Sequence, residues 1–144
     1  MRPPQSHSRG ARRELDRRWL DYLQCTADTG NGQGIAVLPG FLQGIQEFND
    51  RRYFESHETW ESAWRDAPYP ECLFLLGLTK LAVGLAHANR GNVGGARRLL
   101  TDGLRCLECF PEVYAGVDVA GLRATVRSWP AIGVPPIVRL AIDR

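Results

Sequence analysis

The sequence predicts an all-α fold, a single-domain bundle of five or six helices. Apolar residues recur three and four positions apart in successive segments, the spacing that gathers them on one face of a helix. No segment of useful length alternates apolar and polar residues as a half-buried strand does, so we expect no sheet. The chain has 144 residues, of which 44% are apolar and 24% charged, the size and composition of one globular domain.

The N-terminal part is expected to hold a disordered, Arg-rich arm followed by the first helix. Residues 1–10 are rich in Pro, Ser and Arg and show no periodicity, which is typical of a disordered segment. The single helical domain is therefore expected over 11–144. Its first helix is predicted over 11–24, where an apolar stripe is formed by Leu15, Trp19, Tyr22 and Leu23. A loop rich in Gly and Asn follows over 28–34.

Two helices of moderate length are expected next. The first starts just after Pro39, which suits the first turn of a helix, and ends near residues 49–50. Its predicted apolar stripe consists of Phe41, Leu42, Ile45 and Phe48. The second helix is expected from about residue 53 to 64 or 66, because Pro68 and Pro70 disfavour helical backbone in the residues that precede them.

The remaining segments predict a central helix, a helical hairpin and a last helix. The segment 71–89 is apolar almost all round, which predicts a helix packed on several sides and the most buried element of the fold. Gly91 suits the position just after this helix, and Asn92 suits the N-cap of the next one. After a connector over 110–117, Asp118 can cap the last helix.

Charge and composition exclude several classes of partner. The net charge is +2, but residues 1–18 hold six Arg and two acids, so the rest of the chain is slightly acidic. A nucleic-acid reader needs a basic face on the folded domain, so we do not expect nucleic-acid binding. The segment 72–88 is interrupted by Gly, Lys and His residues and is not expected to span a membrane. Because the N-terminus lacks the apolar stretch of a signal peptide, we expect a cytoplasmic protein.

The four cysteines are expected to be reduced thiols. Their number and spacing do not predict a disulfide framework in a chain of this size. Cys106 and Cys109 form a lone Cys-x-x-Cys within a helical pattern. Without a second pair, a zinc or redox role is the less favoured interpretation.

The strongest candidate for chemistry is the helix predicted over 53–66. At about 100° per residue, His57 and Glu61 project to the same side, while Glu58 points further round. A His and a Glu four residues apart can hold a divalent metal such as zinc or manganese, with Glu58 as a third ligand. The same pair can form a hydrogen bond that satisfies both groups without a metal, and this is the interpretation that we favour.

The central helix offers further titratable groups on a stripe that also contains small residues. This stripe consists of Gly77, Lys80, Gly84 and His87. The glycines would let another helix approach closely, so that Lys80 and His87 could face Glu58 or Glu61 inside the bundle as catalytic residues. In the alternative, Lys80 extends outward to solvent and His87 lies at the helix end, exposed or capping carbonyls.

These motifs together resemble an uncharacterised prokaryotic family, domain of unknown function 309. The similarity covers about 41–129 and combines Tyr-Phe-Glu-x-His-Glu and Glu-x-x-Trp with the segments 75–87, 90–92 and 114–119. It implies a small helical bundle, and members of the family are labelled predicted metal-dependent hydrolases. The family's signature positions are occupied by His57, Glu58, Glu61 and Trp64, and its later helix-end pattern by His87, Arg90, Gly91 and Asn92.

Three residues depart from the family's pattern. Arg51 stands where Gly is common, Leu76 where Gln is common, and Ala86 where His is frequent. If the family's turn is kept, Arg51 has to adopt a left-handed backbone conformation that favours glycine. Leu76 removes one candidate polar partner from the site.

Two classes of function remain open. The first is a metal-assisted hydrolase, in which His57 and Glu61 are ligands and Glu58 is a general base or third ligand. Lys80 or His87 would then polarise the substrate. The weakness of this hypothesis is its ligand count, because a typical catalytic zinc has three protein ligands and a water.

The second class is a non-enzymatic helical module that binds another protein or a second copy of itself as a homo-oligomer. The polar cluster would then fix how the helices pack. An exposed Trp60 would anchor such an interface, although burial of Trp60 in the core is the favoured interpretation.

Overall fold

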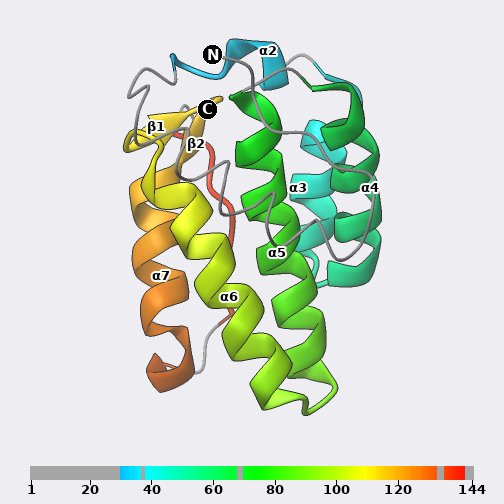
Figure 1. Ribbon diagram of the computed structural model, residues 1–144, viewed down its shortest axis with the longest axis vertical. Helices are drawn as coiled ribbons and strands as arrows, with labels where there is room; N and C mark the ends of the chain where they lie inside the picture. The colour runs from blue at the N-terminus through cyan, green and yellow to red at the C-terminus, as the bar shows by residue number, and fades with distance from the viewer. Residues whose placement is uncertain (1–29, 37, 68–69, 133–134, 142–144) are drawn as a thin grey trace.

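The computed structural model describes residues 30–36, 38–67, 70–132 and 135–141, which form a helical bundle with one small hairpin (Figure 1). In chain order the elements are α2 (Gln33–Ala36), α3 (Phe41–Asn49), α4 (Tyr53–Asp66), α5 (Glu71–Asn89), α6 (Val93–Glu108), β1 (Val113–Tyr114), β2 (Val117–Asp118) and α7 (Val119–Ile132). The predicted all-α class is confirmed, with six helices in the described part of the chain. The arm expected over 1–10 and the helix expected over 11–24 lie outside the described residues.

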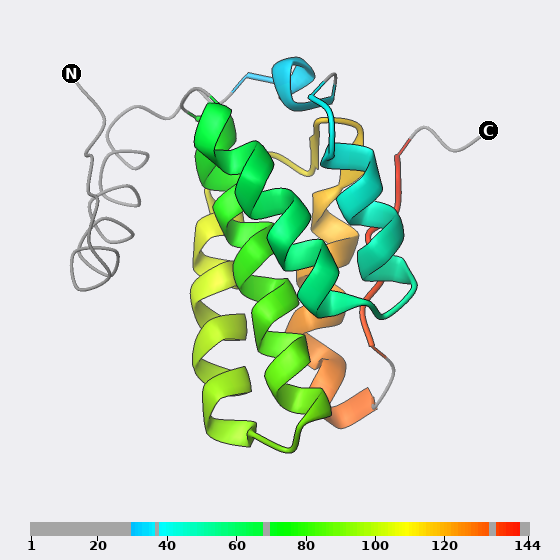
Figure 2. The same cartoon turned by 90° about the vertical axis from the view of Figure 1, so that its right-hand side faces the viewer.

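The central helix of the bundle is α5, which packs against both α4 and α6 (Figure 2). Eleven of its 19 residues are buried, as its almost uniformly apolar sequence predicts. By length and composition alone α5 could cross a membrane, with a mean hydropathy of 1.4 over 18 residues. Its burial against neighbouring helices is that of a core helix.

Glycines bring α6 close to α5. A Cβ on Gly77 would lie 3.1 Å from the Cβ of Cys106, and a Cβ on Gly84 would lie 3.0 Å from the Cγ of Leu100. The close approach predicted from the glycine stripe is therefore confirmed. The helix that meets both glycines is α6, while α4 packs against α5 as well.

A second close contact joins α3 to α4. Trp60 is fully buried, and its Nε1 donates a hydrogen bond to the carbonyl oxygen of Phe41 at 3.1 Å. Gly44 makes room for the indole, since a Cβ there would overlap the ring, and Ser56 Oγ donates to the Gly44 carbonyl at 3.0 Å. The favoured interpretation, burial of Trp60 in the core, is therefore confirmed, and the alternative of an exposed Trp60 at an interface is wrong. Leu42, placed on the apolar stripe by its sequence, is 51% exposed because Gly44 occupies the packed face instead.

Two helices end in the same left-handed turn. After α5, Gly91 has φ 81°, and the N–H of the following residue donates to the carbonyl of His87 at 2.9 Å. After α3, Arg51 takes the equivalent position with φ 65°, and the next N–H donates to the carbonyl of Glu47 at 2.8 Å. Both ends are Schellman motifs. The left-handed conformation predicted for Arg51 is thus confirmed, although this conformation favours glycine.

The N-caps of α6 and α7 follow the sequence. Oδ1 of Asn92 accepts the backbone N–H of Gly95 at 3.1 Å, and Oδ1 of Asp118 accepts that of Gly121 at 2.9 Å. Each side chain satisfies an N–H that the first turn of a helix leaves without a partner. The two predicted helix starts are therefore confirmed.

The prediction of no sheet is wrong in one place, where β1 and β2 pair antiparallel with Tyr114 opposite Val117. Ala115 and Gly116 form the two-residue turn, with φ 54° and 76°, the signs that a type I′ hairpin requires. Strands of two residues are too short to show an alternating pattern, so periodicity cannot predict them. The N–H of Ala115 also donates to the carbonyl of Asn31 at 2.7 Å, which fixes the start of the described chain beside the hairpin.

The C-terminal segment 135–141 is anchored to α3 by one side chain. Nδ2 of Asn49 donates to the carbonyl of Val138 at 3.1 Å, and Oδ1 of Asn49 accepts the N–H of Val138 at 2.8 Å. Val138 is itself buried in the core. A single amide side chain thus satisfies both backbone groups of an extended residue, as a neighbouring strand would.

Candidate functional site

His57 and Glu61 on α4 are in direct contact. Nε2 of His57 lies 3.1 Å from Oε2 of Glu61, and each side chain is 24% exposed. The other carboxylate oxygen, Oε1, lies 3.6 Å from Nη2 of Arg65. The structure therefore confirms the contact that the i, i+4 spacing predicts, and the Glu61 carboxylate also contacts the exposed Arg65.

The second ring nitrogen of His57 also faces an oxygen. Nδ1 lies 3.3 Å from the carbonyl oxygen of Phe54, one turn earlier on α4. The ring centroids of Phe54 and His57 are 5.6 Å apart. A neutral imidazole donates from only one nitrogen, so both contacts are hydrogen bonds only when both nitrogens are protonated. These contacts all come from α4 itself.

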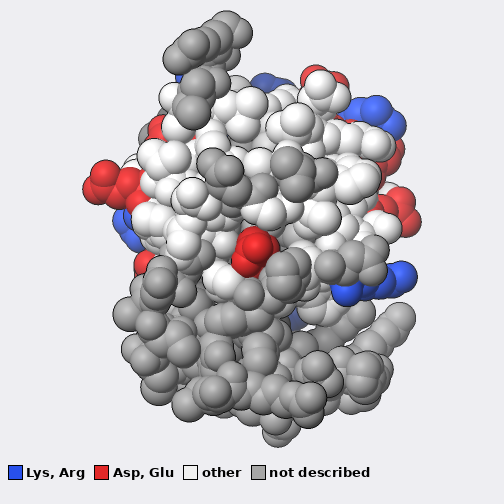
Figure 3. All heavy atoms as spheres, turned by 90° about the horizontal axis from the view of Figure 1, so that it is seen from above, with Lys and Arg blue, Asp and Glu red and all other residues white. Residues whose placement is uncertain are grey.

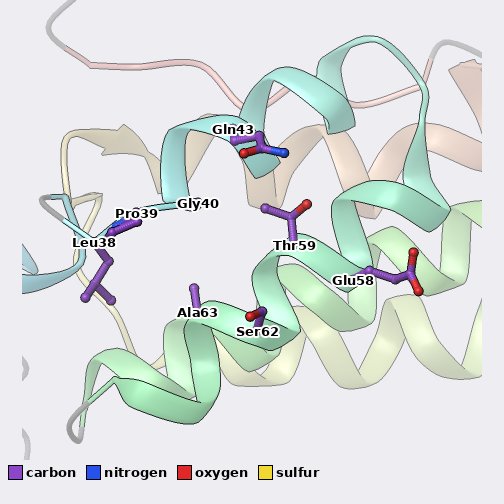
Figure 4. A pocket seen from close by; sticks show the side chains of 8 residues that line it. All are labelled: Leu38, Pro39, Gly40, Gln43, Glu58, Thr59, Ser62 and Ala63. Atoms are coloured by element: carbon purple, nitrogen blue, oxygen red, sulfur yellow. The ribbon is translucent and has the colours of Figure 1, made fainter.

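Glu58 lies on a different face of α4. Its exposed side chain stands at one end of a pocket of about 520 Å³ between α4 and the start of α3 (Figure 4). Gln43, Thr59 and Ser62 contribute polar groups to the same pocket. Oγ1 of Thr59 donates to Oε1 of Glu47 at 2.6 Å, which joins α3 to α4 across the pocket. Leu38, Pro39 and Ala63 line the rest of the pocket, so its wall is mixed in polarity.

The three residues predicted as metal ligands are not gathered at one point. His57 and Glu61 are in contact, whereas Glu58 follows His57 by about 100° around the helix and lines the pocket. Across the described ranges, no group of three His, Cys, Asp or Glu side chains is arranged to hold a metal ion. A catalytic zinc takes three protein ligands, so the pair alone does not complete such a site. Binding of zinc or manganese stays a prediction.

Counting residues along α4 and α5 indicates where Lys80 lies relative to His57. His57 is nine residues before the end of α4 at Asp66, and Lys80 is nine residues after the start of α5 at Glu71. Because a short connection makes the two helices antiparallel neighbours, equal counts place both residues at about the same height. Lys80 is partly exposed. It is the titratable residue of α5 whose height matches the His57 pair.

His87 lies further along α5, near its end. At about 1.5 Å per residue it is roughly 10 Å beyond Lys80 along the helix axis. Nδ1 of His87 lies 3.2 Å from Nδ2 of Asn92, the residue that caps α6. The imidazole therefore takes part in the turn between α5 and α6, which corresponds to the helix-end alternative for this residue.

The cysteines in the described part of the chain are separate thiols. Cys72, Cys106 and Cys109 form no disulfide. Burial raises the pKa of Cys72 to about 12, with a smaller contribution from the carboxylate of Glu71. Burial also raises the pKa of Cys109. Raised pKa values disfavour the thiolate that metal binding and redox chemistry require.

A groove that we did not predict from the sequence lies between α6 and α7, at the end of the bundle away from the hairpin. Figure 1 shows the two helices diverging as they leave the hairpin. The groove has a volume of about 510 Å³. Its apolar walls include Leu100 and Leu104 of α6 and Val126 and Trp129 of α7. Two arginines, Arg97 and Arg127, also line it. The sequence reveals both apolar stripes, but not the divergence that separates them.

Charges of both signs are interspersed on the face that carries α2 and the hairpin. Figure 3 views this face from above, and at its described rim acidic and basic side chains lie next to one another. Most of the described surface in this view is uncharged. Among the described residues in this view, no gathering of basic side chains suits a phosphate backbone.

The fold and site define a small helical bundle with a His–Glu pair on the helix that precedes the central one. Residues 41–99 match the family described as domain of unknown function (DUF309), which includes α3, α4, α5 and the first turns of α6. The resemblance to this family is therefore confirmed over residues 41–99. The matched region contains the candidate residues His57, Glu58, Glu61, Lys80 and His87.

The chain is also similar to a curated protein, the uncharacterized protein YpuF of Bacillus subtilis (strain 168). The two are 37% identical over 70 residues, which is 47% of this chain and 40% of the relative. The similarity therefore leaves more than half of the relative's length unmatched. Because the relative is itself uncharacterized, activity and partners are matters for proposal.

Proposed function

We propose that this protein is a non-enzymatic helical module that binds an apolar helical segment in the groove between α6 and α7. The observation that supports this is the groove itself. Its volume is about 510 Å³, and it presents apolar side chains from two helices, with Val93 at its rim 63% exposed. Paired helices with an apolar seam between them are a common receptor for an amphipathic helix.

In this proposal the His57–Glu61 pair is structural. The Glu61 carboxylate already has two positively charged or protonatable neighbours, His57 at 3.1 Å and Arg65 at 3.6 Å. The remaining nitrogen of His57 faces a carbonyl oxygen of the same helix. Contacts between residues three and four positions apart on α4 therefore account for both ring nitrogens of His57 and both carboxylate oxygens of Glu61.

The competing function is the metal-assisted hydrolase, and one distance favours it. Two ligands on one zinc ion, each about 2.1 Å away in tetrahedral geometry, lie a little over 3 Å apart. The separation of 3.1 Å between His57 Nε2 and Glu61 Oε2 fits that arrangement, and both side chains are partly accessible. This site lacks a third ligand, because Glu58 lies on a different face of α4 from His57 and Glu61.

Elemental analysis of protein purified without chelator decides between the two functions. Three proteins are compared: wild type, His57→Ala, and His87→Ala as a matched control from the other helix. We expect less than stoichiometric zinc and manganese in all three, and no rise in melting temperature with either ion. We also expect His57→Ala to lower the free energy of unfolding by about 0.5–1 kcal/mol, whether or not metal is added. Stoichiometric metal that is lost in His57→Ala and retained in His87→Ala would refute the proposal and support the hydrolase.

A further inference from the structure

The groove between α6 and α7 leaves apolar surface and one polar atom without partners. Val93 is 63% exposed, and Trp129 is only partly buried although it belongs to the apolar face of α7. Nε1 of Trp129 is shielded from solvent and has no hydrogen-bond partner among the described residues. An apolar groove with these features is the surface of a bundle from which one more helix is missing.

We infer that residues 11–24 of the same chain dock in this groove as an amphipathic helix. This deepens the proposed function, on which it rests, by naming the segment that the groove binds. The segment repeats apolar residues at helical positions i, i+4, i+7 and i+8, and these residues are Leu15, Trp19, Tyr22 and Leu23. Such a stripe packs into a seam between two helices in the way that side chains pack in helical bundles.

The chain enters the described fold at the correct place for this docking. The carbonyl of Asn31 accepts the N–H of Ala115 at 2.7 Å, and Ala115 lies in the hairpin that joins α6 to α7. Residues 11–24 are therefore tethered beside the connected ends of the two helices that form the groove. Residues 25–29 can span up to about 17 Å when extended, which is enough to reach the upper part of the groove near Leu104.

The lengths of segment and groove also agree. A helix over 11–24 has 14 residues and is about 21 Å long at 1.5 Å per residue. The groove follows α6 from Leu104 back to Val93, about 16 Å by the same measure. The segment can thus lie along the whole groove with its C-terminal end beside the hairpin and its N-terminal end beside Val93.

The tether makes the chain's own segment the favoured occupant. A segment linked by five residues is present at an effective concentration in the millimolar range, whereas a separate partner has only its solution concentration. An external apolar helix would therefore have to displace residues 11–24. The groove is thus occupied by a segment of its own chain, and a separate partner can bind only to the extent that residues 11–24 dissociate from it.

Hydrogen exchange of the full-length protein, resolved by peptide mass spectrometry, tests this docking. The variant Val93→Glu puts a carboxylate at the rim of the groove, and its position in the first turn of α6 tolerates an acid. Leu42→Glu is the matched control, since Leu42 is also exposed and lies on α3. A second variant, Trp19→Glu, changes the segment and leaves every described residue intact.

We expect amides of 11–24 to exchange at least about tenfold more slowly than in an unfolded peptide in wild type and in Leu42→Glu. This protection should be lost in Val93→Glu and in Trp19→Glu. Equal exchange of 11–24 in wild type and in both of these variants would overturn the inference. So would protection that rises with protein concentration, because it would place the segment of a second copy in the groove. Metal content is measured separately, so failure of the docking is distinguishable from failure of the proposed non-enzymatic function.

Discussion

Replacing Arg51 with glycine should stabilise this protein. Arg51 holds φ 65° at the end of α3, in the position of the Schellman motif that Gly91 occupies after α5. For a residue with a Cβ this left-handed conformation costs about 1–2 kcal/mol. Removing the side chain relieves the cost without changing the hydrogen bonds of the turn, which are formed by backbone groups alone.

The expected gain is smaller than the relief of strain. Glycine loses more backbone freedom on folding, which offsets about 0.5–1 kcal/mol. Arg51 is exposed, so little packing is lost with its side chain. The free energy of unfolding should therefore rise by about 0.5–1 kcal/mol, and the melting temperature by roughly 2–5 °C for a chain of this size.

Chemical denaturation of Arg51→Gly, followed by circular dichroism, measures this gain. Gly91→Ala is the reverse experiment at the second motif. A Cβ at Gly91 meets nothing within 4 Å, so its cost of about 1 kcal/mol should come from the backbone alone. If Arg51→Gly leaves stability unchanged or lowers it while Gly91→Ala destabilises, strain at Arg51 is not the controlling factor and this reasoning is refuted.

Two further predictions concern buried positions. Gly44→Ala should lower the free energy of unfolding by about 1–3 kcal/mol, because the added Cβ overlaps the Trp60 indole. Gly94→Ala on α6 is the control, because a Cβ there meets nothing within 4 Å, and it should raise the free energy of unfolding by about 0.5–1 kcal/mol in the same denaturation assay. If the two substitutions change stability equally, the contact with Trp60 is not the cause. Cys72, whose pKa burial raises to about 12, should be alkylated at pH 8 only as fast as the protein opens, as peptide mass spectrometry would detect. Rapid labelling of the native protein would contradict this. The Cys72 thiol ionises near pH 9 in the unfolded chain but only near pH 12 in the folded protein, so the free energy of unfolding should fall as pH rises from about 9 towards 12.

Local rules predict the helices of this fold well. The apolar run of α5, the cap residue Asn92 and the cap residue Asp118 each act through neighbours within a few positions, so the sequence alone identifies them. The left-handed turn at Arg51 is predicted by resemblance to a family that commonly has glycine there. Each of these features is decided by backbone geometry over one or two turns.

Features that depend on which helices meet are not predicted in the same way. Gly77 and Gly84 mark a close approach, but nothing in the stripe indicates whether the neighbour is α4 or α6. The expectation that Lys80 and His87 face Glu58 or Glu61 stays a prediction. The contact between His57 and Glu61 depends on spacing within one helix, and the structure confirms it.

The contact between Asn49 and Val138 has a consequence for the order of events during synthesis. Neighbouring helices along α3 to α6 can pair as soon as each emerges from the ribosome, because their contacts are close in sequence. The amide of Asn49, by contrast, awaits a partner 89 residues later in the chain. Until that residue has been made, the end of α3 has no strand-like partner, and the core that Val138 completes stays open to water. Chains that have not yet reached Val138 therefore expose apolar surface that quality control can recognise.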